Sequence, residues 1–181
     1  VLVWTALDMR QVARGQNRPS RPTAFGLVVF GVLFLQLLFG AYTAGLNAGY
    51  VSNTWPLMHG SLIPGIDWSR SIWTMLNNDP YVIHFIHRWW AWVAVGFLIV
   101  LARRVRGQSR KASIAIHSAY GVQVLLGIAT VITGVSIHFA VLHQAVGALV
   151  VIATVWGMHL LGRHPAVAST RFASARLSET E

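Results

Sequence analysis

Cysteine is absent from the 181-residue chain, and acidic side chains are scarce, with five Asp and Glu against 14 Lys and Arg. Without cysteine the chain forms no disulfide and offers no thiolate ligand to a metal. Charged residues make up only 10% of the sequence, whereas hydrophobic residues make up 55%. The charged residues stand in short groups separated by long uncharged stretches, and this pattern is typical of a membrane protein.

Two uncharged stretches are long enough to cross a bilayer. No charged side chain lies between Arg21 and Asp67 or between Lys111 and Arg163. Because one span takes about 20 apolar residues, the first stretch holds one span and a loop, and the second holds two spans. A further apolar run follows Pro80, and all runs are continuously apolar rather than alternating, so we predict an all-α integral membrane protein, a four-helix transmembrane bundle. The predicted spans are residues 24–46, 81–102, 112–135 and 137–161.

Basic residues predict the orientation of these spans. They gather before the first span, between the second and third at 103–111, and after the fourth, so we expect these segments in the cytoplasm of a bacterial plasma membrane. The predicted parts are the end of a preceding helix with a basic cytoplasmic segment at 1–22, a transmembrane domain at 23–162 with an external loop at 47–80, and a cytoplasmic tail at 163–181. The net charge of +9 follows from this topology, so we expect membrane lipid and no nucleic acid as a partner.

Two histidines in different predicted spans lie at the same expected depth. The stretch YVIHFIHRWWAW enters the membrane from outside near Pro80, which puts His87 roughly 10 Å below the outer face. The stretch IHFAVLHQAVGALVV enters near Ile137 and puts His143 at about the same depth. Facing imidazoles suit the two axial positions of a haem iron, and ionisable side chains inside a membrane are usually functional. We predict haem iron between His87 and His143, while hydrogen-bonded core histidines are the alternative.

Polar residues near this pair are predicted to contact the rest of the cofactor. Arg88 is placed to bind haem propionates, and it equally fits an arginine that extends to the outer headgroups. His84 and His138 lie about one turn nearer the outside than the predicted ligands, which suits contacts to a ligand or a propionate. Ligation by His84 and His138 themselves is a weaker alternative, because that pair lies close to the headgroups.

A second histidine pair supports an alternative function. His117 and His159 lie near the inner ends of the third and fourth predicted spans, at depths comparable to each other. A second haem there would make the chain a di-haem b-type membrane cytochrome for electron transfer. Interface histidines that bond only to backbone or headgroups are the commoner arrangement.

The external loop carries two further patterns. The stretch GIDWSRSIWTMLNND places Trp68, Ile72 and Leu76 four residues apart, which predicts a short helix lying in the outer interface. The NTWPLM motif precedes it. Its residues are Asn53, Thr54, Trp55, Pro56, Leu57 and Met58.

The sequence resembles a known family in three stretches. GAYTAGLNAGYVSNTWPLMHGSLIP, FIHRW and GVQVLLGIATVITGVSIHFAVLHQAVGALV are similar to the carboxy-terminal half of haem A synthase, an integral membrane enzyme that makes haem A for cytochrome oxidases. NTWPLM is the most specific part, and the resemblance covers about residues 4–161. It implies that this chain, which begins with Val1 rather than methionine, is one half of a pseudo-symmetric eight-helix protein.

The resemblance also implies a reaction and a cofactor. The family oxidises the C8 methyl group of haem O to a formyl group, with water thought to supply the oxygen, and this half is expected to hold an iron-containing haem b at His87 and His143. In the other half, which binds haem O, a glutamate lies three residues before a ligating histidine. Here His84 takes that place, and no predicted span contains Asp or Glu, so the catalytic residues are unknown and this chain alone is expected to be inactive. His59, where the family pattern suggests an acidic residue, is another departure.

The resemblance implies partners as well. Haem O is the expected substrate. Haem O synthase, cytochrome oxidase assembly factors and a second copy of the chain are the further partners that it leaves open.

Overall fold

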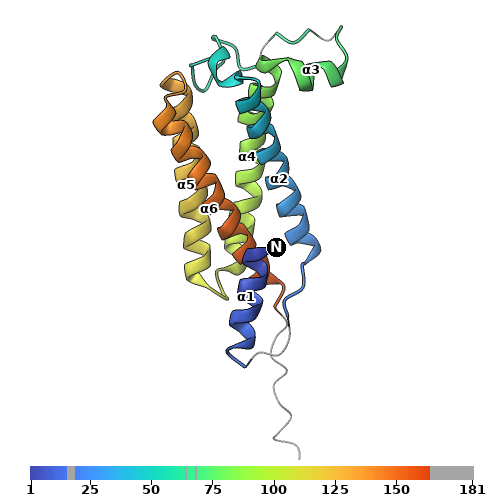
Figure 1. The fold of residues 1–181 in the computed structure, drawn as a ribbon, viewed down its shortest axis with the longest axis vertical. Helices are drawn as coiled ribbons and strands as arrows, with labels where there is room; N and C mark the ends of the chain where they lie inside the picture. The colour runs from blue at the N-terminus through green and yellow to red at the C-terminus, as the bar shows by residue number, and fades with distance from the viewer. Residues whose placement is uncertain (16–18, 64, 68, 164–181) are drawn as a thin grey trace, which may run out of the picture.

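Helices are the main secondary structure in the part of the protein that the computed structural model describes, which is residues 1–15, 19–63, 65–67 and 69–163. Figure 1 shows the helices standing side by side, with α1 at one end and α3 at the other. The elements are α1 (Leu2–Val12), α2 (Ala24–Gly45), the 3-10 helix η1 (Ala48–Val51), α3 (Ile72–Asn78), α4 (Pro80–Val105), α5 (Arg110–Ile132) and α6 (Ile137–Leu161). The predicted all-α class is confirmed.

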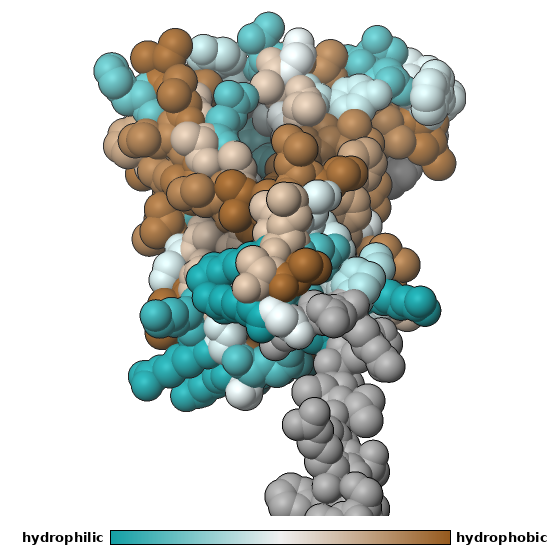
Figure 2. All heavy atoms as spheres, turned by 60° about the horizontal axis from the view of Figure 1, so that its bottom comes forward, coloured by the Kyte–Doolittle hydropathy of each residue, from teal (hydrophilic) through white to brown (hydrophobic). Residues whose placement is uncertain are grey.

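Four helices are long and apolar enough to cross a membrane, and they are α2, α4, α5 and α6. Their ends agree with the predicted spans to within a few residues. Figure 2 shows a hydrophobic band around the middle of the molecule and hydrophilic residues gathered at the α1 end. The chain is therefore a multi-pass membrane protein, as predicted.

Local sequence signals determine where these helices begin. The Asp79 carboxylate accepts hydrogen bonds from the backbone N–H groups of Tyr81 and Val82, at 3.0 and 3.2 Å, and Pro80 occupies the first turn of α4. Thr23 and Ser109 cap α2 and α5 in the same way. A cap of this kind satisfies N–H groups that have no partner within the helix, and it fixes the start of the span.

The helices pack as two pairs, α2 with α4 and α5 with α6, and α4 joins the pairs through contacts with α5 and α6. The buried hydrophobic cluster lies in the half of the bundle near α1. Its members are Val29, Leu33, Leu98, Leu101, Ala102, Val105, Ala112, Ile116, Val150, Ala153, Met158 and Leu160. In the other half, which we call the loop end, no residue of α5 beyond Ile116 and no residue of α6 before Gly147 is buried.

The loop end is covered by the connection between α2 and α4. Met58 and Ser61 pair through two backbone hydrogen bonds around His59 and Gly60, which both have positive φ, as a tight two-residue hairpin turn requires. The peptide between Trp55 and Pro56 is cis. α3 confirms the short helix predicted at Ile72 and Leu76. Trp68, which belonged to that prediction, and residues 164–181 of the predicted tail lie outside the described residues.

The turn between α5 and α6 packs against η1. A Cβ added at Gly49 would lie 2.8 Å from Cγ2 of Val135, so only glycine fits there without a shift. Val135 itself has a positive φ of 63°. This contact brings the loop after α2 onto the α5–α6 pair and holds the two pairs together at the loop end.

Candidate functional site

His87 projects from α4 onto a glycine of α2. A Cβ added at Gly40 would lie 3.0 Å from Cε1 of the imidazole, so the ring occupies space that any other residue at position 40 would reduce. One turn earlier on α2, Nε2 of Gln36 lies 3.2 Å from Nδ1 of His87 and donates to the His87 carbonyl at 3.2 Å. α2 therefore provides both a flat surface and a polar contact for this ring.

His143 also lies against a glycine and near a glutamine, on the other helix pair, although a different nitrogen of its ring faces the glutamine amide. It projects from α6 onto α5, where a Cβ added at Gly127 would lie 3.0 Å from Cε1 of the ring. Nε2 of Gln123, one turn earlier on α5, lies 3.3 Å from Nε2 of His143, and Nδ1 of His143 donates to the Gln123 carbonyl at 3.1 Å. This bond requires the tautomer protonated on Nδ1, so the lone pair lies on Nε2 and faces the Gln123 amide. Turning that amide away would release the lone pair to a metal.

The repeated arrangement was not predicted from the sequence, although a signal for it was present. QLLFG begins at Gln36 and QVLLG begins at Gln123, so a glutamine precedes a glycine by four residues in two spans. Each glutamine also has a buried Oε1 atom without a hydrogen-bond partner among the described residues. Buried amide oxygens without partners are uncommon in proteins, and here both lie next to a predicted ligand.

His87 lies on the α2–α4 pair and His143 lies on the α5–α6 pair. Each histidine lies about two turns from the N-terminal end of its helix. The described residues contain no group of three or more His, Cys, Asp or Glu side chains that could hold a metal ion. Two imidazoles alone do not complete a tetrahedral site, whereas a macrocycle supplies the remaining ligands of a haem iron.

The packing at the same depth also suits a large planar guest. The α5–α6 pair buries its residues near α1 but none along the outer turns that carry Gly127 and His143. α2 likewise has no buried residue beyond Leu33. Two imidazoles and two buried amide oxygens without partners, on helices that carry no acidic side chain, are the observations that fit a haem.

Arg88 is buried and holds the loop motif. Its Nη1 atom donates to the carbonyl of Thr54 at 2.9 Å and lies 3.4 Å from the carbonyls of Pro56 and Leu57. Its Nη2 atom lies 3.2 Å from Nε2 of His84, which is 2% exposed. The guanidinium therefore does not extend to the headgroups, and the NTWPLM loop is fixed to α4 by the residue next to His87.

The remaining histidines of the loop end have separate environments. His138 is exposed, and the structure gives it no contact with His143. His59 bonds through Nε2 to the Val51 carbonyl at 2.6 Å and stacks on Tyr81 with ring centroids 5.9 Å apart. His59 thus closes the loop onto the first turn of α4, a role that does not need an acidic side chain.

The second histidine pair is used in local contacts. His117 donates from Nδ1 to the Ser113 carbonyl at 2.8 Å within α5. His159 is fully buried, with its Nε2 atom 2.9 Å from Oδ1 of Asp8 and the ring of Trp4 at 5.0 Å. Asp8 and Trp4 come from α1, so His159 joins α1 to α6, and this contact was not predicted.

Comparison with known proteins adds to this geometry. Residues 1–155 match the model of a family described as cytochrome oxidase assembly protein. The chain is 54% identical over 162 residues to a protein named heme A synthase from Erythrobacter litoralis (strain HTCC2594), which covers 89% of this chain and 48% of that protein. It is 49% identical over 169 residues to a protein named heme A synthase from Sphingopyxis alaskensis (strain DSM 13593 / LMG 18877 / RB2256). That match covers 92% of this chain and 48% of the other protein.

More distant proteins of the same name are also similar. A heme A synthase from Caulobacter vibrioides (strain ATCC 19089 / CIP 103742 / CB 15) is 37% identical over 159 residues, covering 84% of this chain and 46% of that protein. The chain thus spans about half the length of the curated relatives it matches. No solved structure matches it significantly.

Proposed function

The chain belongs to the cytochrome oxidase assembly protein family, and from this membership we propose that it is the haem b-holding half of a haem A synthase. The observation that carries the proposal is the repeated setting of two histidines. His87 rests on Gly40 and His143 rests on Gly127, on two helix pairs that face each other at one depth. In this proposal His87 and His143 would hold the haem iron through the Nε2 atoms of their imidazoles.

The proposed reaction of the whole protein is the oxidation of the C8 methyl group of haem O to a formyl group. Water supplies the oxygen atom, and the electrons and protons that leave the methyl carbon must be carried away. A bound haem b supplies a carrier of single electrons to this reaction. The substrate haem O would lie in a second four-helix half with its own histidine ligands.

The residues of this chain bind and enclose the cofactor in this proposal. Gln36 and Gln123 orient the two imidazoles, and Arg88 fixes the loop that covers the loop end. The Nε atom of Arg88 is buried and has no partner among the described residues, so a haem propionate would be its acceptor. α2, α4, α5 and α6 contain no Asp or Glu, so the groups that move protons during the oxidation would belong to the other half.

The proposed location is a bacterial plasma membrane with the α1 end in the cytoplasm. Arginine and lysine at that end support this orientation. Cysteines introduced at Gln108 and Ser61 test it, because both positions lie outside the spans. In intact cells an impermeant thiol reagent should label the Ser61→Cys variant and not the Gln108→Cys variant, and the reverse pattern would overturn the orientation. Haem O, haem O synthase, oxidase assembly factors and a second copy of the chain are the proposed partners.

The haem content of the purified chain tests the proposed cofactor. The wild type should carry one b-type haem per chain, identified by its reduced absorption bands and by chromatography of the extracted pigment. His87→Ala and His143→Ala should each lose it, whereas His117→Ala and His159→Ala should keep it. Retention of the full haem content by both His87→Ala and His143→Ala would refute the proposal.

A further inference from the structure

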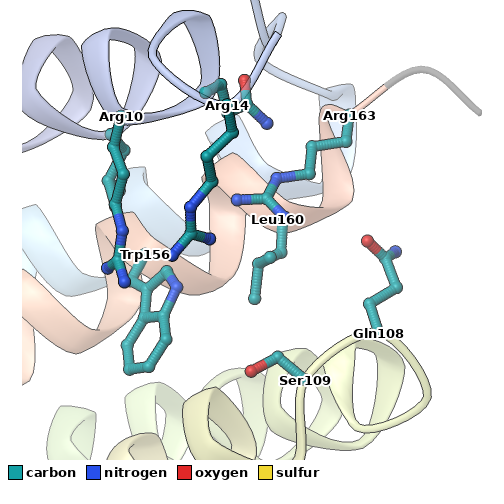
Figure 3. A pocket seen from close by; sticks show the side chains of 9 residues that line it. Arg10, Arg14, Gln108, Ser109, Trp156, Leu160 and Arg163 are labelled. Atoms are coloured by element: carbon teal, nitrogen blue, oxygen red, sulfur yellow. The ribbon is translucent and has the colours of Figure 1, made fainter. Parts of the chain in front are cut away.

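A pocket of about 200 Å³ lies at the α1 end of the bundle, far from the histidine site. The end of α1, the end of α6 and the turn between α4 and α5 form its walls (Figure 3). Nothing in the proposed function uses this pocket.

Three arginines come together there. Arg10 and Arg14 come from the end of α1, and Arg163 directly follows α6. Figure 3 shows the guanidinium groups of Arg14 and Arg163 extending toward each other across the pocket, while Arg10 reaches down beside Trp156. No acidic side chain lines the pocket among the described residues. Three positive charges therefore share one small space without an opposite charge in its walls.

The electrostatics of Arg163 agree with this geometry. Its pKa lies below the usual arginine value, first because the side chain is partly desolvated and then because Arg14 and Arg10 are positively charged. Repulsion among the three arginines destabilises the pocket when it is empty, and an anion between them would remove this cost.

The rest of the lining indicates which anion fits. Ser109 accepts a hydrogen bond from the N–H group of Ala112, so its own hydroxyl hydrogen is free to be donated into the pocket. Trp156 and the buried Leu160 give the pocket an apolar floor. Arginine forks bind phosphate oxygens in pairs, and the apolar floor suits a ligand that also has hydrocarbon.

We propose that this pocket binds the phosphate group of an anionic phospholipid headgroup. Arg14 and Arg163 hold the phosphate oxygens, Arg10 adds positive charge, and the glycerol and upper acyl chain of the lipid lie against Trp156 and Leu160. The position agrees, because Arg163 follows the last turn of a membrane span, where headgroups lie. A lipid bound here joins α1 to the turn between α4 and α5.

Lipid binding by the purified chain in a neutral detergent tests the proposal. Phosphatidylglycerol, phosphatidylcholine and inorganic phosphate are added separately, and bound lipid is counted by native mass spectrometry while the melting temperature is followed. The test variant is Arg14→Gln with Arg163→Gln. The matched control is Arg103→Gln with Arg106→Gln, which removes two exposed arginines that do not line the pocket.

Phosphatidylglycerol should bind the wild type and the control, and it should bind the test variant at least about tenfold more weakly. Arg14→Lys with Arg163→Lys keeps the charge but loses the paired donors, so it should weaken binding by an intermediate factor. This variant also tests the pocket if the glutamine variant does not fold. Equal weakening in the test and control variants would overturn the proposal in favour of diffuse attraction to the basic surface. An equal rise in melting temperature with inorganic phosphate alone would overturn it in favour of a free phosphate site.

Discussion

Gly127 of α5 and His143 of α6 are in such close contact that a methyl group on the glycine would lie 3.0 Å from Cε1 of the imidazole. Gly40 and His87 repeat this relationship with the same distance. The two glycines therefore determine how near each imidazole lies to the neighbouring helix, and under the proposed function they set where each ring would meet the haem iron.

Gly127→Ala should reduce the haem content of the purified chain, because the imidazole of His143 has to shift by a few tenths of an ångström. Overpacking of this kind costs about 1–3 kcal/mol. The ratio of b-type absorption to protein, measured with limiting haem, gives the effect. Gly121→Ala is the matched control, because it lies on the same helix with nothing within 4 Å of the added Cβ. Equal haem content in both variants would contradict the assigned position of the ring.

Gln36→Leu should weaken haem binding about tenfold and raise the midpoint potential of the haem. Nε2 of Gln36 lies 3.2 Å from Nδ1 of His87, and the buried Oε1 atom of Gln36 has no partner among the described residues. We expect the amide to turn so that Oε1 accepts from Nδ1 once Nε2 of His87 binds iron. Loss of the acceptor makes the imidazole a weaker donor, and this favours ferrous haem. A redox titration measures the shift. The control Gln144→Leu changes an exposed glutamine on α6, and a similar shift there would exclude a specific role for Gln36.

Arg88→Met should release the NTWPLM loop. The guanidinium donates to the carbonyl of Thr54 and lies near two further loop carbonyls, and hydrogen bonds to a charged group contribute about 1.5–3 kcal/mol each. Ser52 is 1% exposed, so in a Ser52→Cys background a thiol reagent reports loop opening. The labelling rate should rise more than tenfold.

Arg70→Met is the matched control for this experiment, because Arg70 forms an exposed ion pair with Asp79 in the same loop region. Such pairs contribute about 0–1 kcal/mol, so the labelling rate should change little. Unchanged labelling in the Arg88→Met variant would mean that the loop is held without the guanidinium.

The chain expressed alone should bind haem b and should not convert haem O to haem A. The four spans lack Asp and Glu, and His84, the other histidine of α4, is already in contact with Arg88. Membranes containing the chain are supplied with haem O, and the extracted pigment is separated by chromatography. Sustained formation of haem A, lost in a His84→Ala variant, would place the proton-transfer step in this half.

The sequence by itself determined the positions of the spans and the candidate ligands. Hydropathy reports on the solvent around each segment, and caps such as Asp79 and Pro80 act within a few residues, so these features could be predicted locally. The prediction that His87 and His143 lie at one depth in the membrane also followed from counting residues along two helices. α3 and the helix at the start of the chain were also predicted from short stretches, because the pattern of apolar residues in each stretch is local.

The contacts between helices were decided only by the tertiary structure. The pairing of Gln36 and Gly40 with His87, the bonds from Arg88 to the loop, and the contact of Asp8 with His159 each join residues from separate segments. Such contacts depend on how each helix is rotated and shifted against its neighbour. Small differences in packing set that rotation, and a uniformly apolar span carries little information about which of its faces meets another helix.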